Sequence, residues 1–280
     1  MNDRSAPAAR ERGGGAPLGA RGLRSQPVER VLIDVLSFPL DPPFRASVRL
    51  ISTVDCILCR VMTKDGLEGA GYSFAFGAEE ARALAAIMRL LADRLIGMDV
   101  AANESTWSAL WSSLALLGQP GAGVTALAAL DIAIWDIRGK AVDAPLYRLL
   151  GTARESIPTY GSGGSLDATI DQLTAEMADY VEVGHRAVKM KLGCADDCER
   201  VKAVRDALGP GPRLILDATQ KWTPKEALAA ARRLERFESA FPSHVPALTS
   251  GRSLAGISRR WPGRRRSRSH AAAIRWTSAS

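Results

Sequence analysis

Acidic residues are missing from the end of this 280-residue chain. No Asp or Glu follows Glu238, whereas residues 239–280 contain eight Arg. The whole-chain net charge is +7, but the two ends carry this excess: without residues 1–30 and 239–280 the remaining body is mildly acidic. A nucleic-acid-binding domain instead gathers basic residues on one folded face. We therefore expect no nucleic-acid partner for the body of the protein.

Long apolar runs are also missing. No continuous run approaches the roughly 18 residues that a bilayer-spanning helix needs. The first thirty residues contain six Arg but no apolar segment of the kind found in signal peptides. We therefore expect a cytoplasmic protein without a membrane partner.

Cysteine is scarce, with Cys56, Cys59, Cys194 and Cys198 as the full set. Cys56 and Cys59 lie in an apolar run that predicts a strand, where their spacing sends the two side chains to opposite faces. Zinc and redox pairs usually occupy turns, so this geometry suits neither. Cys194 and Cys198 have helical spacing, which leaves a zinc site as an alternative, but ordinary reduced thiols are the favoured interpretation.

The two ends of the chain differ in composition from its body. Residues 1–30 are rich in Gly, Ala, Arg and Pro without periodicity, which predicts a disordered extension or a start codon assigned too early. Residues 239–280 form an anomalous basic tail that we also expect to be disordered. Three explanations compete for it: a solvated tail, an Arg/Ser segment that binds nucleic acid, or an out-of-frame translation of a GC-rich gene. The third is favoured because misread GC-rich codons yield Arg, Pro, Ser, Gly and Ala.

Residues 31–150 predict an α+β domain. Apolar runs at residues 31–36, 46–52 and 57–63 indicate strands of an antiparallel meander, and Lys64-Asp65-Gly66 supplies a tight turn after the third run. Helical periodicity follows at residues 78–95, 104–117 and 124–142.

Residues 151–238 change to an alternation of strands and helices. Strands are predicted at residues 157–160, 187–191 and 214–217, and helices at residues 170–183, 196–208 and 224–237. This pattern is typical of the first three βα units of a (β/α)8 barrel. A complete barrel takes about 250 residues, so we expect an incomplete one.

The strand at residues 187–191 places two lysines together. Side chains alternate along a strand, so Lys189 and Lys191 share one face and Met190 points to the other; Asp217 and Thr219 share a face by the same rule. Mutual repulsion and burial both disfavour charged ammonium groups, which would lower a lysine pKa towards the range of a general base. The alternative is that both lysines merely pair with acids at the strand end. Asp217 lies where barrel active sites lie, or else caps the loop that follows.

These motifs resemble a known family. AVKMKLG at residues 187–193, LILDATQ at residues 214–220 and ALAALDIAIWD at residues 126–136 are together similar to the mandelate racemase/muconate lactonizing enzyme family of the enolase superfamily. The resemblance covers about residues 31–238. It implies a capping domain at residues 31–150, followed by the first part of a (β/α)8 TIM-type barrel at residues 151–238. It also implies a Mg²⁺-dependent lyase or isomerase, either an acid-sugar dehydratase or a mandelate-type racemase, which abstracts the proton next to a carboxylate and stabilises the enolate on the metal.

The resemblance implies a role for each residue of the site. Lys191 would be the proton-abstracting base, and Lys189 would tune it and contact the carboxylate of a sugar acid substrate. Asp217 would be one Mg²⁺ ligand. Thr219 would contact substrate where the family has Asn, although a hydroxyl has less reach and fewer donors than an amide. A homo-oligomer is also expected.

Two further metal carboxylates and a His–Asp pair, which the family takes from later strands, have no counterparts. No acid follows Glu238, and His244 and His270 lie in the basic tail. We therefore expect this polypeptide to bind Mg²⁺ weakly or not at all, and to be inactive. The alternatives are a non-catalytic remnant and a basic-tailed binding protein.

Overall fold

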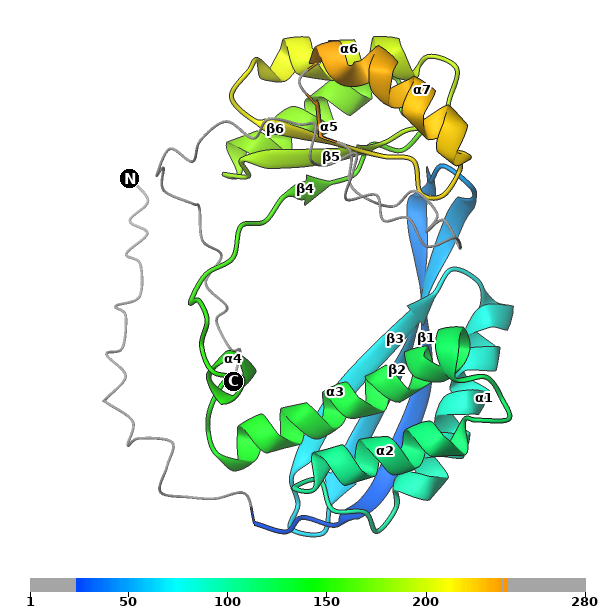
Figure 1. Ribbon diagram of the computed structural model, residues 1–280, viewed down its shortest axis with the longest axis vertical. Helices are drawn as coiled ribbons and strands as arrows, with labels where there is room; N and C mark the ends of the chain where they lie inside the picture. Colours follow the sequence, from blue (N-terminus) through cyan, green and yellow to red (C-terminus); the bar gives the residue numbers. More distant parts are fainter. Residues whose placement is uncertain (1–23, 238, 241–280) are drawn as a thin grey trace, which may run out of the picture. The chain divides into compact units, whose positions relative to one another are not determined.

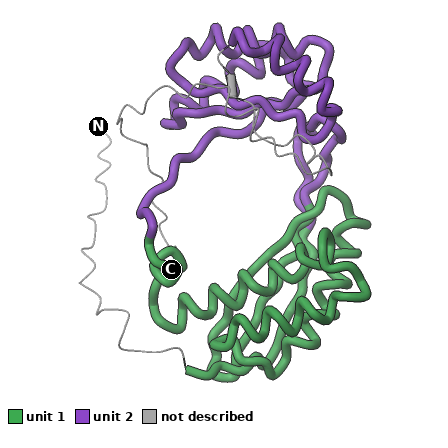
Figure 2. The backbone as a smooth tube through the Cα atoms, viewed as in Figure 1, with its two compact units in different colours: residues 1–36, 55–152 green, residues 37–54, 153–280 purple. Residues whose placement is uncertain are grey.

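The computed structural model describes residues 24–237 and 239–240, which form two compact units (Figures 1 and 2). The first comprises the described residues up to Leu36 together with Asp55–Thr152. The second comprises Ser37–Val54 and the described residues from Ala153 onward. The long strands β1 (Val28–Arg45) and β2 (Leu50–Thr63) therefore belong to both units, with their connected ends grouped with the second.

Unit 1 is a three-stranded sheet covered by helices. The strands have the order β1-β2-β3, and β2 pairs antiparallel with β3 (Glu68–Ala75). The helices are α1 (Ala78–Leu95), α2 (Asn103–Ser113), α3 (Val124–Ala141) and the short α4 (Leu146–Leu149). The predicted α+β arrangement is present, and Gly66 (φ 89°) occupies the predicted turn between β2 and β3. β1 begins at Val28, inside the segment expected to be an extension.

Helix α3 packs directly on the backbone of β3. A Cβ atom at Gly69 would lie 2.1 Å from the carbonyl oxygen of Ala133, and one at Gly71 would lie 2.0 Å from that of Ala129. Only glycine permits this approach. Asp136 of α3 accepts a hydrogen bond from the backbone N–H of Ala70 (2.9 Å), which binds the helix to the strand. This acidic side chain therefore has a structural role in unit 1.

The apolar character of α3 is explained by the core of unit 1. Residues Gln119–Ala141 are long and apolar enough to cross a membrane by length and composition alone. In the structure, however, one side of the helix fills the core with fully buried side chains, including Leu127, Leu130, Ile134 and Ile137. Cys59 is buried in the same core, whereas Cys56 is partly exposed, which agrees with the opposite faces that the strand alternation predicted.

Unit 2 contains a parallel four-stranded sheet in the order β4-β5-β6-β7. Its strands are β4 (Gly161–Ser162), β5 (Ala187–Lys191), β6 (Arg213–Asp217) and β7 (Ser239–Ala240), and its helices are α5 (Ile170–Glu182), α6 (Asp197–Leu208) and α7 (Pro224–Leu234). The predicted alternation of strand and helix is confirmed for β5 to α7. β7 lies inside the tail that we expected to be disordered, and residues 241–280 lie outside the described residues.

The strand predicted at residues 157–160 is wrong. Pairing with β5 begins only at Gly161, which stands opposite Val188, and residues 157–160 form no strand. Pro158 supplies no backbone N–H to a ladder, which explains why the apolar character of this stretch did not produce a strand. The glycine-rich stretch at residues 161–164 therefore begins with strand β4 itself.

The helices of unit 2 begin at clear sequence signals. Thr169 and Gln172 form a capping box at the start of α5, and Thr223 and Glu226 form another at α7, where Pro224 occupies the first turn. The buried side chains between helices and sheet include Leu173, Val188, Met190, Val201 and Leu214. This packing fixes which face of β5 is left for polar residues.

Candidate active site

The lysines of β5 lie on the face of the strand opposite the core. Val188 and Met190 are fully buried in the core of unit 2, and Lys189 and Lys191 alternate with them on the other face. Parallel pairing places Lys189 opposite Ile215 and Lys191 opposite Asp217 of β6. The predicted alternation is therefore confirmed, and the strand register brings Asp217 beside the lysines.

One oxygen of the Asp217 carboxylate lies close to the ammonium groups of both Lys189 and Lys191. Oδ2 of Asp217 lies 2.9 Å from Nζ of Lys189 and 2.7 Å from Nζ of Lys191. The Asp217 side chain is 5% exposed, and the lysine side chains are 16% and 15% exposed. Both lysines therefore pair with an acid at the strand end, as the alternative interpretation of the sequence required.

The hydrogen bonds around Asp217 favour its ionised form. Burial by itself would raise the pKa of this carboxyl group. The hydrogen bonds from Lys191, Lys189 and the backbone N–H of Thr219 outweigh it and hold the pKa well below its usual range. Asp217 is therefore a carboxylate throughout the neutral range, and the cluster of two ammonium groups and one carboxylate has an excess of one positive charge.

Thr219 faces Lys191 as well as Asp217. Its Oγ1 accepts a hydrogen bond from Nζ of Lys191 (2.8 Å), and its backbone N–H donates to Oδ1 of Asp217 (2.9 Å). The sequence predicted that Thr219 shares a face with Asp217, but it did not predict the bond to Lys191. Thr219 adopts a left-handed backbone conformation (φ 40°), which is rare for a β-branched residue.

Two residues that the sequence analysis did not select border the cluster, and a third contacts the loop after β4. The ring of Tyr160 lies 5.9 Å from Nζ of Lys189, and Oγ of Ser47 donates to the backbone carbonyl of Asp217 (3.4 Å). Glu176 of α5 accepts a hydrogen bond from the backbone N–H of Gly164 (3.0 Å). Tyr160 directly precedes β4, whereas the active sites of barrels lie at the carboxyl ends of strands, so its position was not a usable signal. Nothing in the sequence connected Ser47 or Glu176 to the lysines.

The loop after β4 is held against the lysine strand. The backbone N–H of Gly163 donates to the carbonyl of Lys189 (3.0 Å), and that of Lys191 donates to the carbonyl of Gly164 (3.3 Å). A Cβ atom at Gly163 would meet the Glu176 carboxylate, which would then have to move aside. The stretch at residues 161–164 therefore packs its backbone closely against β5.

The described residues supply only part of a magnesium site. Asp217 has the oxygen donors that Mg²⁺ prefers, but its two oxygens already accept hydrogen bonds from Lys189, Lys191 and Thr219. Within residues 24–237 and 239–240, no group of three His, Cys, Asp or Glu side chains is arranged to hold a metal ion. These residues therefore fit one ligand of a metal ion and not a complete site.

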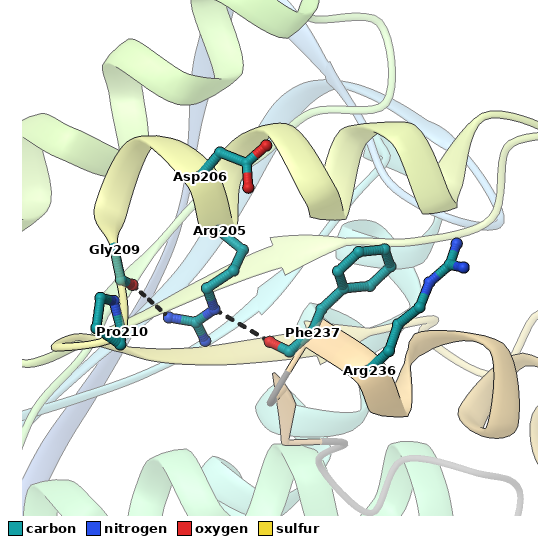
Figure 3. A pocket seen from close by; sticks show the side chains of 6 residues that line it. All are labelled: Arg205, Asp206, Gly209, Pro210, Arg236 and Phe237. Atoms are coloured by element: carbon teal, nitrogen blue, oxygen red, sulfur yellow. Dashed lines mark hydrogen bonds between the residues drawn. The ribbon is translucent and has the colours of Figure 1, made fainter.

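A surface depression of about 420 Å³ lies away from the lysines (Figure 3). It is lined by Arg205, Asp206, Gly209, Pro210, Arg236 and Phe237. Gly209 and Pro210 precede the start of β6, whereas Asp217 ends that strand. The Arg205 guanidinium donates to the backbone carbonyls of Gly209 (2.9 Å) and Phe237 (3.0 Å), so it holds two neighbouring backbone segments together. The lysine cluster is therefore the better candidate site.

Comparison with family profiles identifies two segments of the chain. Residues 30–151 match the profile of the mandelate racemase/muconate lactonizing enzyme N-terminal domain, and residues 172–242 match that of the enolase C-terminal domain-like group. The second match extends a few residues past Phe237, where the resemblance read from the sequence stopped. It includes β5, β6 and β7.

Characterised relatives share about a third of the aligned residues. The 3,6-anhydro-alpha-L-galactonate cycloisomerase of Streptomyces coelicolor is 32% identical over 215 residues, which cover 75% of this chain and 60% of the relative. The L-talarate/galactarate dehydratase of Salmonella typhimurium is 32% identical over 220 residues, covering 75% of this chain and 55% of the relative. The chain therefore spans less than two thirds of the length of these relatives.

Solved structures agree with this assignment. The Salmonella typhimurium dehydratase liganded with Mg and L-lyxarohydroxamate superposes with a TM-score of 0.72 at 29% identity, covering 82% of this chain and 60% of that structure. A racemase from Streptomyces coelicolor A3(2) with bound magnesium gives a TM-score of 0.73 at 30% identity, covering 78% and 62%. The fold of this chain is therefore similar to that of structures that contain magnesium.

Proposed function

The chain belongs to the mandelate racemase/muconate lactonizing enzyme family of the enolase superfamily, and on that premise we propose that its lysine cluster serves abstraction of the proton next to the carboxylate of an acid sugar. The observation that carries the proposal is the convergence of Lys189 and Lys191 on Asp217 at the carboxyl ends of adjacent parallel strands. Active sites of barrel enzymes lie at these strand ends.

Lys191 is proposed as the base. In its neutral amine form, Nζ of Lys191 takes the proton from the substrate carbon, and the electron pair of the broken C–H bond moves into the carboxylate group. The ammonium of Lys189 binds the substrate carboxylate, which favours negative charge there. Asp217 is their common partner and brings the two lysines together beside the position proposed for the substrate.

Asp217 is proposed as one ligand of Mg²⁺. When bound, the metal would stabilise the negative charge that develops on the substrate oxygens. Relatives whose structures contain Mg support this cofactor, and one of these structures also contains L-glucarate, which supports an acid-sugar substrate. Whether the reaction ends as dehydration or racemisation depends on groups beyond this cluster. The incomplete barrel and the homo-oligomer stay predictions.

The 280-residue polypeptide itself is proposed to be a poor catalyst. A single carboxylate does not repay the free energy that Mg²⁺ loses when it gives up bound water. Within the part of the chain that the structure describes, no group of three His, Cys, Asp or Glu side chains is arranged to hold a metal ion. We therefore expect only slow proton exchange at high Mg²⁺ concentration.

Hydrogen–deuterium exchange at the α-carbon of galactarate or L-talarate tests the proposal. With tens of millimolar Mg²⁺ in D₂O, proton NMR should show slow, Mg²⁺-dependent loss of the α-proton signal. Lys191→Ala should reduce the rate by at least about 100-fold, the usual contribution of a general base. Lys202→Ala is a matched control, because Lys202 is an exposed lysine of α6 paired with Asp206.

Two results would contradict the proposal. Exchange that survives in Lys191→Ala would show that Lys191 is not the base. Absence of exchange in the unaltered protein, at any Mg²⁺ concentration that it tolerates, would favour the non-catalytic remnant.

A further inference from the structure

Lys189 and Lys191 share Asp217 but differ in their other partners. Nζ of Lys191 donates to Asp217 Oδ2 (2.7 Å) and to Thr219 Oγ1 (2.8 Å), whereas Nζ of Lys189 has the carboxylate at 2.9 Å and the Tyr160 ring at 5.9 Å. Both ammonium groups are almost equally exposed. The Thr219 hydroxyl is therefore the feature that distinguishes them.

The backbone at Thr219 holds this hydroxyl in place. Its φ of 40° is unfavourable for a β-branched residue, and such conformations persist where surrounding contacts fix them. Here the backbone N–H of Thr219 is bound to Asp217 Oδ1, and Lys221 closes the turn through its N–H to the carbonyl of Ala218 (3.0 Å). The branched side chain also has few χ1 rotamers. The acceptor is thus presented to Lys191 with little freedom.

We propose that Thr219 is a positioning residue that fixes the Nζ of Lys191 between its own hydroxyl and Asp217, and so distinguishes the base from the neighbouring Lys189. An ammonium group has three N–H donors. Two of those of Lys191 are directed to fixed acceptors, which restricts a flexible four-carbon side chain to one location. Lys189 keeps the freedom needed to follow a substrate carboxylate. This inference rests on the proposed function for the identity of the base, but the hydrogen bond can be tested without catalysis.

Competitive acetylation of the metal-free, substrate-free protein measures the effect. A limiting amount of acetic anhydride modifies both lysines, and tandem mass spectrometry gives the ratio of modification at Lys191 to that at Lys189 within each molecule. The hydrogen bond to Thr219 holds the Nζ of Lys191 in one location, which hinders its turning towards the reagent. We expect Thr219→Val to raise the ratio about tenfold, the effect of losing one hydrogen bond to a charged group.

Matched variants separate the hydroxyl from the backbone. Thr219→Gly removes the acceptor and tolerates positive φ, so it should also raise the ratio even if Thr219→Val does not fold. Thr219→Ser restores a hydroxyl and should return the ratio to within about twofold of the unaltered protein. Ser47→Ala, which removes a hydroxyl that bonds to the Asp217 backbone and to neither lysine, should leave the ratio unchanged.

The outcomes distinguish the inference from the proposed function. An unchanged ratio in both Thr219→Val and Thr219→Gly, or an equal rise in Thr219→Ser, would overturn the positioning role. Failure of Lys191→Ala to affect proton exchange would instead remove the proposed function, whatever the acetylation ratio shows.

Discussion

At the residue scale, the state of Asp217 determines the electrostatics of the cluster. Its carboxylate is almost fully buried and neutralises one of two ammonium groups that lie on neighbouring positions of the same strand face. Removing one partner of such a pair leaves uncompensated charge in a poorly solvated place. Asp217 therefore has a structural role in addition to any role in metal binding.

We predict that Asp217→Asn lowers the free energy of unfolding by on the order of 3 kcal/mol at pH 7, because both ammonium groups lose their charged partner. Urea unfolding of the two proteins measures this difference. Lys202→Ala again provides a control, since exposed pairs contribute less than about 1 kcal/mol. A loss no larger than that of the control would show that the ion pairs do not stabilise the fold.

The Asp217→Asn variant also tests how the contribution of Asp217 to the free energy of unfolding depends on pH. The folded-state pKa of Asp217 lies below its unfolded value, so its contribution is complete above about pH 4 and disappears as the pH falls through the folded pKa. The difference in unfolding free energy between the original protein and Asp217→Asn should therefore shrink below about pH 4. A constant difference down to pH 2 would contradict this assignment.

At the residue scale, the sequence predicted which side chains share a strand face, but not which groups those side chains contact. Alternation along β5 was enough to place Lys189 and Lys191 together and to separate them from Met190. The bond from Lys191 to Thr219, and the approach of Ser47 and Tyr160, depend on turns and long-range packing that spacing does not encode.

At the element scale, the contact of α3 with β3 is the most constrained packing of unit 1. Gly69 and Gly71 allow the helix to rest on the strand backbone, and Asp136 and Lys140 bind the same strand through Ala70 N–H and the Glu68 carbonyl. These two side chains occupy backbone groups at the sheet edge, which hinders pairing with another strand.

We predict that Gly71→Ala destabilises the protein by about 3 kcal/mol or more, because the new methyl group would overlap the Ala129 carbonyl and α3 would have to move. Thermal or urea unfolding followed by circular dichroism measures the loss. Gly211→Ala is the matched control, because no atom lies within 4 Å of the added Cβ there, and it should change stability by less than about 0.5 kcal/mol. Equal effects of the two substitutions would show that α3 is not closely packed on β3.

Element prediction succeeded where local signals were strong. Helix α1 and strand β5 have the predicted bounds, and the Thr169 and Thr223 capping boxes mark where α5 and α7 begin. It failed at residues 157–160, where an apolar stretch containing Pro158 lies outside the sheet. Apolar residues indicate burial, but membership of a sheet requires a partner strand with free hydrogen-bonding groups.

At the scale of the whole molecule, metal binding is the property that the described residues leave incomplete. We predict that adding 10 mM Mg²⁺ to the chelator-treated 280-residue protein raises its Tm by less than about 2 °C. A Kd of about 10 mM or weaker limits the stabilisation to about 0.4 kcal/mol. Differential scanning calorimetry with matched ionic strength measures the shift. A rise of several degrees that Asp217→Asn abolishes would show that residues outside the described ranges supply further ligands.

The sequence by itself determined the family, the alternation of strands and helices from β5 to α7, and the shared face of Lys189 and Lys191. These features follow from local periodicity and from short motifs that adjacent residues carry. The sequence did not predict that residues 50–63 form one strand, since it placed two strands at residues 46–52 and 57–63. Tertiary structure alone decided that Ser37–Val54 groups with the second unit, that both lysines meet on one oxygen of Asp217, and that the Thr219 hydroxyl accepts a hydrogen bond from Lys191. These arrangements depend on strand register and turn geometry, because they join atoms contributed by residues far apart in the chain.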